Sequence, residues 1–198
     1  MKSHIQCIIV AIAMFVLQSC SLPTNSSTDD DLSALLTIMQ VSNIADQNSD
    51  WQNYTMVITA TTSNPTKASN PIIDRATWRR VGDSMEIAYS YAHSSNAGAV
   101  VGTGTYLFSM PPGYTVDSNK IDISTLESVG IVGVAAYADG VNKMTGVSKI
   151  YASNQLALQV GNDTNNHQYM AGGPAHAEPF GAIDRRISFH AMVPIAGW

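Results

Sequence analysis

The feature that most restricts the fold of this chain is a strict alternation of apolar and polar side chains near its middle. Within Trp78–Met110, large apolar residues occupy every second position of one run: Met85, Ile87, Tyr89 and Tyr91. Successive side chains of a strand point to opposite faces of a sheet, so a period of two indicates a half-buried strand. The pair Gly82-Asp83 before the run indicates a turn, and a polar connection after it leads to the apolar run Tyr106–Phe108. The stretch therefore predicts two antiparallel strands that nucleate a sheet.

Similar runs recur along the rest of the chain, and they are the other candidate strands: Tyr54–Ala60, Val129–Ala138, Met144–Ala152, Leu156–Val160 and Ile187–Val193. The run Val129–Ala138 is continuously apolar, as expected of a strand buried on both faces. Ser153-Asn154 predicts a hairpin turn between the two runs that flank it. About eight to ten short strands separated by Gly, Pro and Asn turns are typical of an all-β sandwich or jelly roll. Because these strands carry few charges, we expect association to cover the edges of the sheet.

Length and charge exclude some classes of protein. The chain has 198 residues, enough for one sizeable domain with appendages, and its apolar content of 45% suffices for a core. Its net charge is −5, and its basic residues are dispersed along the sequence. Nucleic acid is therefore not an expected partner, because neutralising phosphates requires clustered Lys and Arg.

The first twenty residues are organised like the signal peptide of a bacterial lipoprotein. Lys2 precedes the apolar run Ile8–Leu17, which is too short to span a bilayer but has the length of a signal-peptide core. Leu17-Gln18-Ser19-Cys20 then resembles a lipobox, whose Cys receives the lipid. We expect residues 1–19 to be removed and Cys20 to anchor the protein by its acyl chains in the bacterial envelope, at the outer membrane. A plain cleaved signal and an uncleaved anchor are the alternatives.

A tether and a short helix are expected between the signal peptide and the sheet. Residues 20–31 are polar and lack periodic apolar positions, which predicts a disordered tether. The segment 32–50 is expected to contain a short helix and a linker. The helical spacing of its apolar residues predicts an amphipathic helix over Asp31–Ile44, with acidic residues at its N-terminus to cap it. That helix either begins an oligomeric stalk or packs on its own domain. The β-sandwich domain is expected over 51–198.

Several phrases in a fixed order resemble a known domain. They are Trp78–Asp83 (WRRVGD), Gly102–Tyr114 ending in MPPGY, and Ile187–Trp198 ending in VPIAGW. Together they resemble the domain at the C-terminal tips of phage tail fibres, related virion proteins and fibre-derived bacterial adhesins. The resemblance extends over about Trp51–Trp198 and implies an antiparallel jelly roll of the tumour necrosis factor and complement type, which usually forms trimers.

The resemblance also implies roles for individual residues. It assigns five aromatic side chains to the core or the trimer contact: Trp78, Tyr106, Phe108, Phe189 and Trp198. The chain departs from the family in its lipoprotein-like leader and in the lack of a long fibrous shaft. Both differences favour a role at a bacterial surface or a host membrane over a role in a virion.

The sequence offers a ligand-binding candidate in the polar segment Gly161–Phe180, which we interpret as a loop. Amides, an aromatic ring and imidazoles there suit sugar hydroxyls and the apolar face of a sugar. The candidate ligand-binding residues are Asn162, Asp163, Asn165, Asn166, His167, Tyr169 and His176. A merely solvated loop is the alternative, and His93–Gly98 is a second candidate. We predict no catalytic residues, no metal site and no cofactor, because no catalytic motif occurs and Cys7 and Cys20 are the only cysteines.

These patterns lead to one main hypothesis and its alternatives. The main hypothesis is a non-enzymatic, homotrimeric β-sandwich, anchored by lipid, that binds a glycan or protein receptor in surface adhesion or receptor recognition. The alternatives are a structural protein of a phage, at the tail-fibre tip or as a head decoration in the virion, and a prophage lipoprotein that blocks a phage receptor. An enzyme acting on glycans is a further class, to be recognised by turnover.

Overall fold

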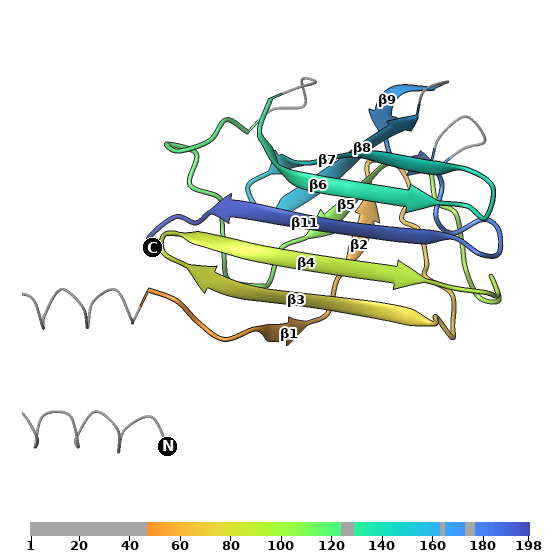
Figure 1. Cartoon of the computed structure of the whole chain (residues 1–198), viewed down its shortest axis with the longest axis horizontal. Coiled ribbons are helices and arrows are strands. Elements are labelled where there is room, and N and C mark those ends of the chain that lie inside the picture. Colours follow the sequence, from red (N-terminus) through yellow and green to blue (C-terminus); the bar gives the residue numbers. More distant parts are fainter. Residues whose placement is uncertain (1–46, 124–128, 163–164, 173–176) are drawn as a thin grey trace, which may run out of the picture. The chain divides into compact units, whose positions relative to one another are not determined.

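Eleven strands in antiparallel pairs form one curled sheet in the part of the chain that the structure describes (Figure 1). The computed structural model describes residues 47–123, 129–162, 165–172 and 177–198. The strands are β1 (Gln52–Tyr54), β2 (Ile58–Ala60), β3 (Ile73–Val81), β4 (Ser84–Ala92), β5 (Gly104–Ser109), β6 (Ile131–Ala138), β7 (Lys143–Ala152), β8 (Gln155–Asn162), β9 (Asn165–Tyr169), β10 (Ala171–Gly172) and β11 (Arg186–Pro194). The prediction of an all-β protein is confirmed.

The N-terminal predictions lie outside the described residues. These are the signal peptide, Cys20, the tether and the helix Asp31–Ile44. No helix among the residues that are described has both the length and the apolar character needed to cross a membrane. Within the described residues, strand-like pairing already occurs before residue 51, since Asn48 bridges Val81 and the Ser49 amide donates to the Arg80 carbonyl at 3.1 Å.

The order of strands in the sheet is β1-β3-β4-β11-β6-β7-β8-β5-β10, with β2 paired to β5 and β9 paired to β8. In Figure 1, β3, β4, β11 and β6 lie nearest the viewer, while β2 and β5 lie behind them. The sheet therefore curls until its two halves face each other across the core. Phe108 of β5 shows this directly, because its ring centroid lies 5.5 Å from that of Phe189 on β11.

The C-terminal strand β11 occupies the centre of the front half of the sheet. It pairs along its length with β4 and over six positions, Arg186–Ala191, with β6. Its residues alternate between exposed and buried from Arg186 to Val193, as the sequence predicted. The hairpin of β7 and β8 across Ser153-Asn154 is also confirmed.

Three predictions about the strands are wrong, the first being that the run at Met85 pairs with the run at Tyr106. Strand β4 pairs instead with β3, across the turn at Gly82, and with β11. Strand β5 pairs with β2, β8 and β10. The connection of residues 93–103 crosses from one half of the sheet to the other, so Tyr89 and Phe108 meet through the core, with centroids 6.2 Å apart.

The other two wrong predictions are that Tyr54–Ala60 forms one strand and that Val129–Ala138 is buried on both faces. Tyr54–Ala60 is not one strand, because β1 pairs with β3 while β2 pairs with β5, and the chain changes layers at the buried Met56. The run Val129–Ala138 is not buried on both faces. Strand β6 buries Ala135 and Tyr137 on its inner face, whereas the side chain of Val134 on the outer face is 64% exposed.

The core is rich in aromatic rings. Trp78, Tyr106, Phe108 and Phe189 are buried in it, and Trp198 is partly buried against it. The Trp198 ring stacks on Trp78 with centroids 6.2 Å apart. Trp78, Tyr106, Phe108 and Phe189 therefore fill the interior of the sheet.

Candidate functional site

The candidate site is the outer surface of β3, β4, β11, β6 and β7, whose side chains can be assigned from strand register. The register aligns them in transverse rows. The first row is Ile73, Ala92, Arg186, Ala138 and Lys143. The second row is Arg75, Ser90, Ser188, Ala136 and Thr145. The third row is Thr77, Ala88, His190, Val134 and Val147. A shorter fourth row is Arg79, Glu86 and Met192. We call these four rows the outer face.

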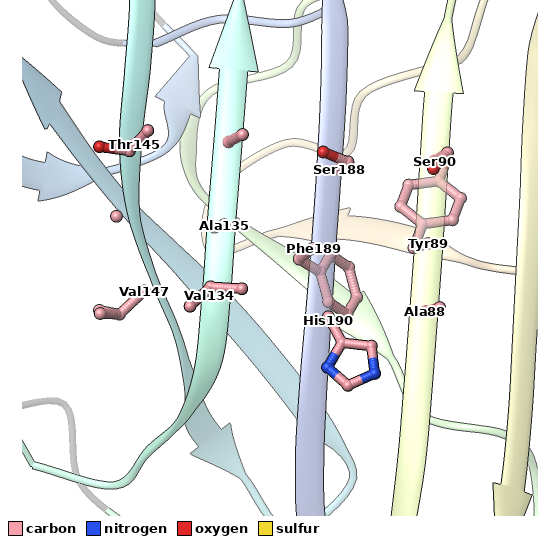
Figure 2. A pocket seen from close by; sticks show the side chains of 12 residues that line it. Ala88, Tyr89, Ser90, Val134, Ala135, Thr145, Val147, Ser188, Phe189 and His190 are labelled. Atoms are coloured by element: carbon pink, nitrogen blue, oxygen red, sulfur yellow. The ribbon is translucent and has the colours of Figure 1, made fainter.

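Small side chains leave hollows in the outer face. One hollow of about 690 Å³ lies over the second and third rows, and Figure 2 shows Val134, Val147 and His190 around it. A second hollow of about 440 Å³ lies over the first and second rows and includes Ile73, Arg186 and Lys143 in its lining. The floor of both consists of strand backbone with Ala, Ser and Thr side chains, which do not rise far above the sheet. The outer face thus offers a rigid, shallow trough.

Three cations stand at one end of the trough. Arg75, Lys143 and Arg186 are exposed, and none of the ion pairs found among the described residues includes them. Two nearby carboxylates already have partners, since Asp74 is 2.6 Å from Lys67 and Asp139 is 2.9 Å from Arg185. A third, Asp184, is exposed beside the turn between β6 and β7, and the ion pairs found among the described residues do not include it. The positive charge at this end of the outer face is therefore not neutralised by these acids.

One carboxylate lies at the opposite end of the outer face and is satisfied by two bases. Arg79 donates from Nε to Glu86 Oε2, and Glu86 Oε1 lies 2.7 Å from His190 Nε2. Burial opposes ionisation of Glu86, but the hydrogen bonds from Arg79 and His190 outweigh it and hold the pKa of this carboxyl below its ordinary value. The Trp51 ring covers the guanidinium of Arg79, at 4.9 Å from the ring centroid.

The Glu86 cluster predicts a dependence of stability on pH. A lowered pKa in the folded state stabilises the protein above the ordinary glutamate pKa of about 4.3, and this contribution is lost as the pH falls through the lower, folded-state pKa. We expect Glu86→Gln to lower the free energy of unfolding at pH 7 by about 1 kcal/mol, because Arg79 and His190 are partly exposed and screened by water. Thermal melts from pH 7 to pH 3 measure this difference.

The control for that experiment is Asp122→Asn, which removes an exposed acid for which no ion pair is found. Its melting curve should run parallel to that of the wild type throughout the pH range. A Glu86→Gln deficit that persists unchanged down to pH 3 would show that the ionised carboxylate is not what stabilises the cluster.

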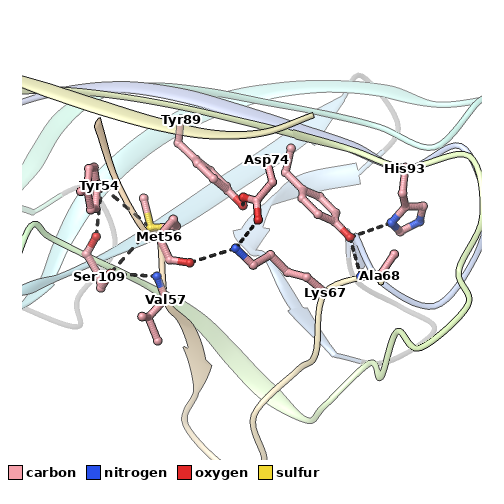
Figure 3. Close-up of polar contacts among 10 residues, drawn as sticks. Tyr54, Met56, Val57, Lys67, Ala68, Asp74, Tyr89, His93 and Ser109 are labelled. Carbon is pink, nitrogen blue, oxygen red and sulfur yellow. Dashed lines mark hydrogen bonds and ion pairs between the residues drawn. The ribbon is translucent and has the colours of Figure 1, made fainter. Parts of the chain in front are cut away.

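Hydrogen bonds fix the loops at the cationic end of the sheet. Figure 3 shows Lys67 between the Met56 carbonyl, at 3.0 Å, and Asp74 Oδ2. Tyr89 donates its hydroxyl to Asp74 Oδ1 at 3.0 Å, and burial raises the pKa of this phenol well above its ordinary value. These bonds tie the loop around Lys67 to the inner side of β3 and β4, so the strand end that carries Arg75 is held in place.

A second buried network fixes the segment that leads into β11. Glu178 accepts hydrogen bonds from the amides of Phe180, at 2.6 Å, and Gly181, at 2.5 Å, and from the Tyr106 hydroxyl at 3.2 Å. Tyr137 donates to the Glu178 carbonyl at 3.1 Å, and burial raises its pKa to about 12. These phenols stay protonated at neutral pH, and the Glu178 carboxylate accepts hydrogen bonds from within the protein. The network therefore has a structural role.

The predicted ligand-binding segment is not a continuous loop. Asn162 closes β8, and Asn165, Asn166 and His167 belong to β9, while the side chains of these four lie outside the described part of the structure. Asp163 and His176 lie outside it entirely. Tyr169 is half-buried, with its ring 6.2 Å from Tyr151 and 5.4 Å from the Lys149 ammonium. The prediction of a loop fails because β8 and β9 pair through this polar sequence.

The second candidate segment, His93–Gly98, does not expose its imidazole. His93 is 1% exposed, and its Nδ1 lies 2.9 Å from the Tyr91 hydroxyl (Figure 3). Its Nε2 lies 2.7 Å from the Ala182 carbonyl. Both ring nitrogens thus have partners within the protein. His93 joins the loop after β4 to the segment before β11 and is not presented to a ligand.

The sequence reasoning missed the outer face and its cations. Arg75, Lys143 and Arg186 lie far apart in the chain, and only the pairing of β3, β11 and β7 through intervening strands brings them to one end of a surface. A local signal existed in β11, where basic and hydroxyl side chains alternate with buried apolar ones. Within the described ranges, no group of three or more His, Cys, Asp or Glu side chains is placed to hold a metal ion.

Comparison with known proteins adds no family. No protein-family model, no curated protein and no solved structure matches this chain.

Proposed function

We propose that this protein is a non-enzymatic binding module, anchored through lipid on Cys20 to the bacterial outer membrane, that acts in surface adhesion or receptor recognition. The observation that carries the proposal is the outer face. It combines hollows of about 690 and 440 Å³, hydroxyl and methyl side chains, and three exposed cations on a rigid sheet. Surfaces on rigid scaffolds that combine apolar lining with a few polar groups are typical binding sites.

The arrangement of ionisable groups supports binding over chemistry. Glu86, Asp74 and Asp139 are each held by a basic partner, and Glu178 accepts hydrogen bonds from backbone amides. Groups held in this way fix the loops and strand ends, and they do not converge with a nucleophile on a common point.

The proposal includes a jelly-roll topology and a homotrimer. Both derive from the resemblance of the phrases WRRVGD, MPPGY and VPIAGW to phage fibre tips. The facing halves of the sheet and the C-terminal strand at the centre of one half support this topology. A trimer would present three equal faces, and avidity would strengthen binding to a surface that offers repeated epitopes. Sedimentation equilibrium of the full-length protein in detergent measures the oligomeric state, and a monomer would contradict the proposed trimer.

The anchor and the binding role are tested on the full chain, expressed in a Gram-negative bacterium. We expect a mature protein that begins at Cys20 and carries diacylglyceryl and N-acyl groups, as measured by intact mass. The detergent-solubilised protein should retain labelled surface glycans or envelope proteins without altering them. The matched variant Cys20→Ser should lose the acyl mass and leave the membrane fraction, since it lacks the acceptor thiol.

Each result bears on a separate part of the proposal. An unmodified Cys20 would rule out the lipid anchor, and a lack of retention on any envelope component would rule out the binding role. Cleavage of a retained glycan would show an enzyme instead. Resistance of expressing cells to phage adsorption would favour the receptor-blocking alternative.

A further inference from the structure

We propose that the cationic end of the outer face binds an acidic polysaccharide whose sugar units carry carboxylates. This inference rests on the proposed binding function and names the class of ligand and the residues that receive it. The site consists of the first and second rows of the outer face, with Arg186, Lys143 and Arg75 as the groups that attract the carboxylates.

The sign of the charge is the first argument. The 440 Å³ hollow is lined by Arg186 and Lys143, and no carboxylate is part of its lining. This positive surface belongs to a chain whose net charge is −5. Of the acids at the same end, Asp74 and Asp139 are held by Lys67 and Arg185, and Asp184 lines neither hollow. A local concentration of one sign of charge over a low-dielectric floor attracts ligands of the opposite sign.

The spacing of the cations is the second argument. Arg186 and Lys143 stand in the same row with Ala138 between them, so their strands are two spacings apart, or about 10 Å. Arg75 is also two strands from β11, on the other side and one row further along. In a polysaccharide that carries a carboxylate on every sugar unit, every second carboxylate recurs at a similar interval, so alternate carboxylates can contact these cations in succession.

The floor of the trough is the third argument. Ser90, Ser188 and Thr145 place hydroxyls between the cations, where they can donate to and accept from sugar hydroxyls. The first two rows of the outer face hold no Phe, Tyr or Trp side chain, so they lack the aromatic platform on which a neutral sugar stacks. Charge and hydrogen bonds must therefore supply the recognition, which favours an acidic glycan.

Other anionic partners fit this surface less well. An extended acidic peptide usually adds to the edge of a sheet, whereas Arg186 lies on the central strand. Nucleic acid requires more clustered cations than these three positions supply. The guanidiniums of Arg75 and Arg186 suit carboxylates, because they can form paired hydrogen bonds with them.

The test uses the full-length protein in detergent and fluorescent polygalacturonate oligosaccharides, with dextran oligosaccharides of equal length as the neutral probe. We expect polygalacturonate to bind, dextran not to bind, and the affinity to fall as salt is raised. Arg186→Gln and Lys143→Gln should each weaken binding by about tenfold, and the double variant by more, since charge-assisted hydrogen bonds are lost.

Lys120→Gln is the matched control, because it removes one positive charge beside Asp83, at the opposite end of the strands. Its affinity should stay within about twofold of the wild type. The substituted positions 143 and 186 are exposed, so the variants should melt like the wild type. Ser188→Glu provides a second variant, which places a negative charge on the floor of the trough and should abolish binding.

Several outcomes would overturn the inference while leaving the proposed function intact. One is retention of envelope components by the wild type with unchanged affinity in the double variant. Others are equal binding of dextran and preferential binding of single-stranded DNA or of an acidic peptide. Dissociation of an oligomer in Arg186→Gln, with no loss of glycan affinity per site, would show that this face joins copies of the chain. Failure of the wild type to retain any envelope component would instead remove the proposed function itself.

Discussion

Replacement of Phe108 by alanine is expected to destabilise the protein by about 3–5 kcal/mol, the cost of removing a buried phenylalanine ring. Phe108 is fully buried, and its ring lies 5.5 Å from Phe189 and 6.2 Å from Tyr89. It is the residue of β5 that joins the back of the sheet to β4 and β11 in front. The cavity would separate the two halves of the sheet, and a thermal melt should show a decrease in Tm of about 10 °C.

Val57→Ala is the matched control for this prediction, since it also shortens an apolar side chain and Val57 lies beside β5, where its carbonyl accepts a hydrogen bond from the Ser109 amide at 2.9 Å. The Val57 side chain is 54% exposed, so its truncation should change the free energy of unfolding by no more than about 0.5 kcal/mol. Equal melting temperatures for Phe108→Ala and the wild type would mean that the halves of the sheet are not held together through this ring.

Substitution of Gly146 by alanine is expected to destabilise the protein by about 3 kcal/mol or more, through overpacking in a well-ordered sheet. A Cβ atom on Gly146 would stand 1.8 Å from the Gln159 carbonyl oxygen and 2.8 Å from the Cα of Val160, both on the neighbouring strand β8. These are backbone atoms, so no rotation of a side chain can relieve the clash. The substitution should therefore loosen the pairing of β7 with β8, measured as faster amide hydrogen exchange in both strands and as a lower Tm.

Gly82→Asn is the control that tests whether the destabilisation by Gly146→Ala comes from the steric clash of the added Cβ atom. Gly82 has a φ of +63°, but no heavy atom lies within 4 Å of the position its Cβ would take. Asparagine tolerates this left-handed conformation, so the turn between β3 and β4 should survive at a cost below about 1 kcal/mol. If Gly146→Ala were as mild as Gly82→Asn, β8 would have to be displaced without loss of pairing.

The parts of the fold that depend on local pattern could be predicted from the sequence. The alternation in β4 identifies Met85, Ile87, Tyr89 and Tyr91 as inward-facing residues, and all four are buried. The turn at Ser153-Asn154 likewise joins neighbouring strands and needs no distant information. Both features follow from the period of a strand and from the chemistry of turns.

The pairing of distant strands could not be predicted in the same way. Nothing in the sequence of β4 indicates that Tyr89 lies opposite Phe189, because strand pairing depends on the whole sheet. Val134 looks like a core residue in sequence, yet it is exposed, because no segment among the described residues covers the outer face at this position. The clustering of the cations on the outer face also depends on distant pairing. Arg75 and Arg186 come together only after β4 has paired with both β3 and β11.

The position of β11 also has a consequence for synthesis of the protein. Strands β4 and β6 both depend on β11 for a partner, and β11 follows β4 by about a hundred residues. While the ribosome is still adding residues before Arg186, the middle of the front layer has a gap, and the nascent chain cannot close around its aromatic rings. The core can therefore be completed only after residues 186–194 have been made.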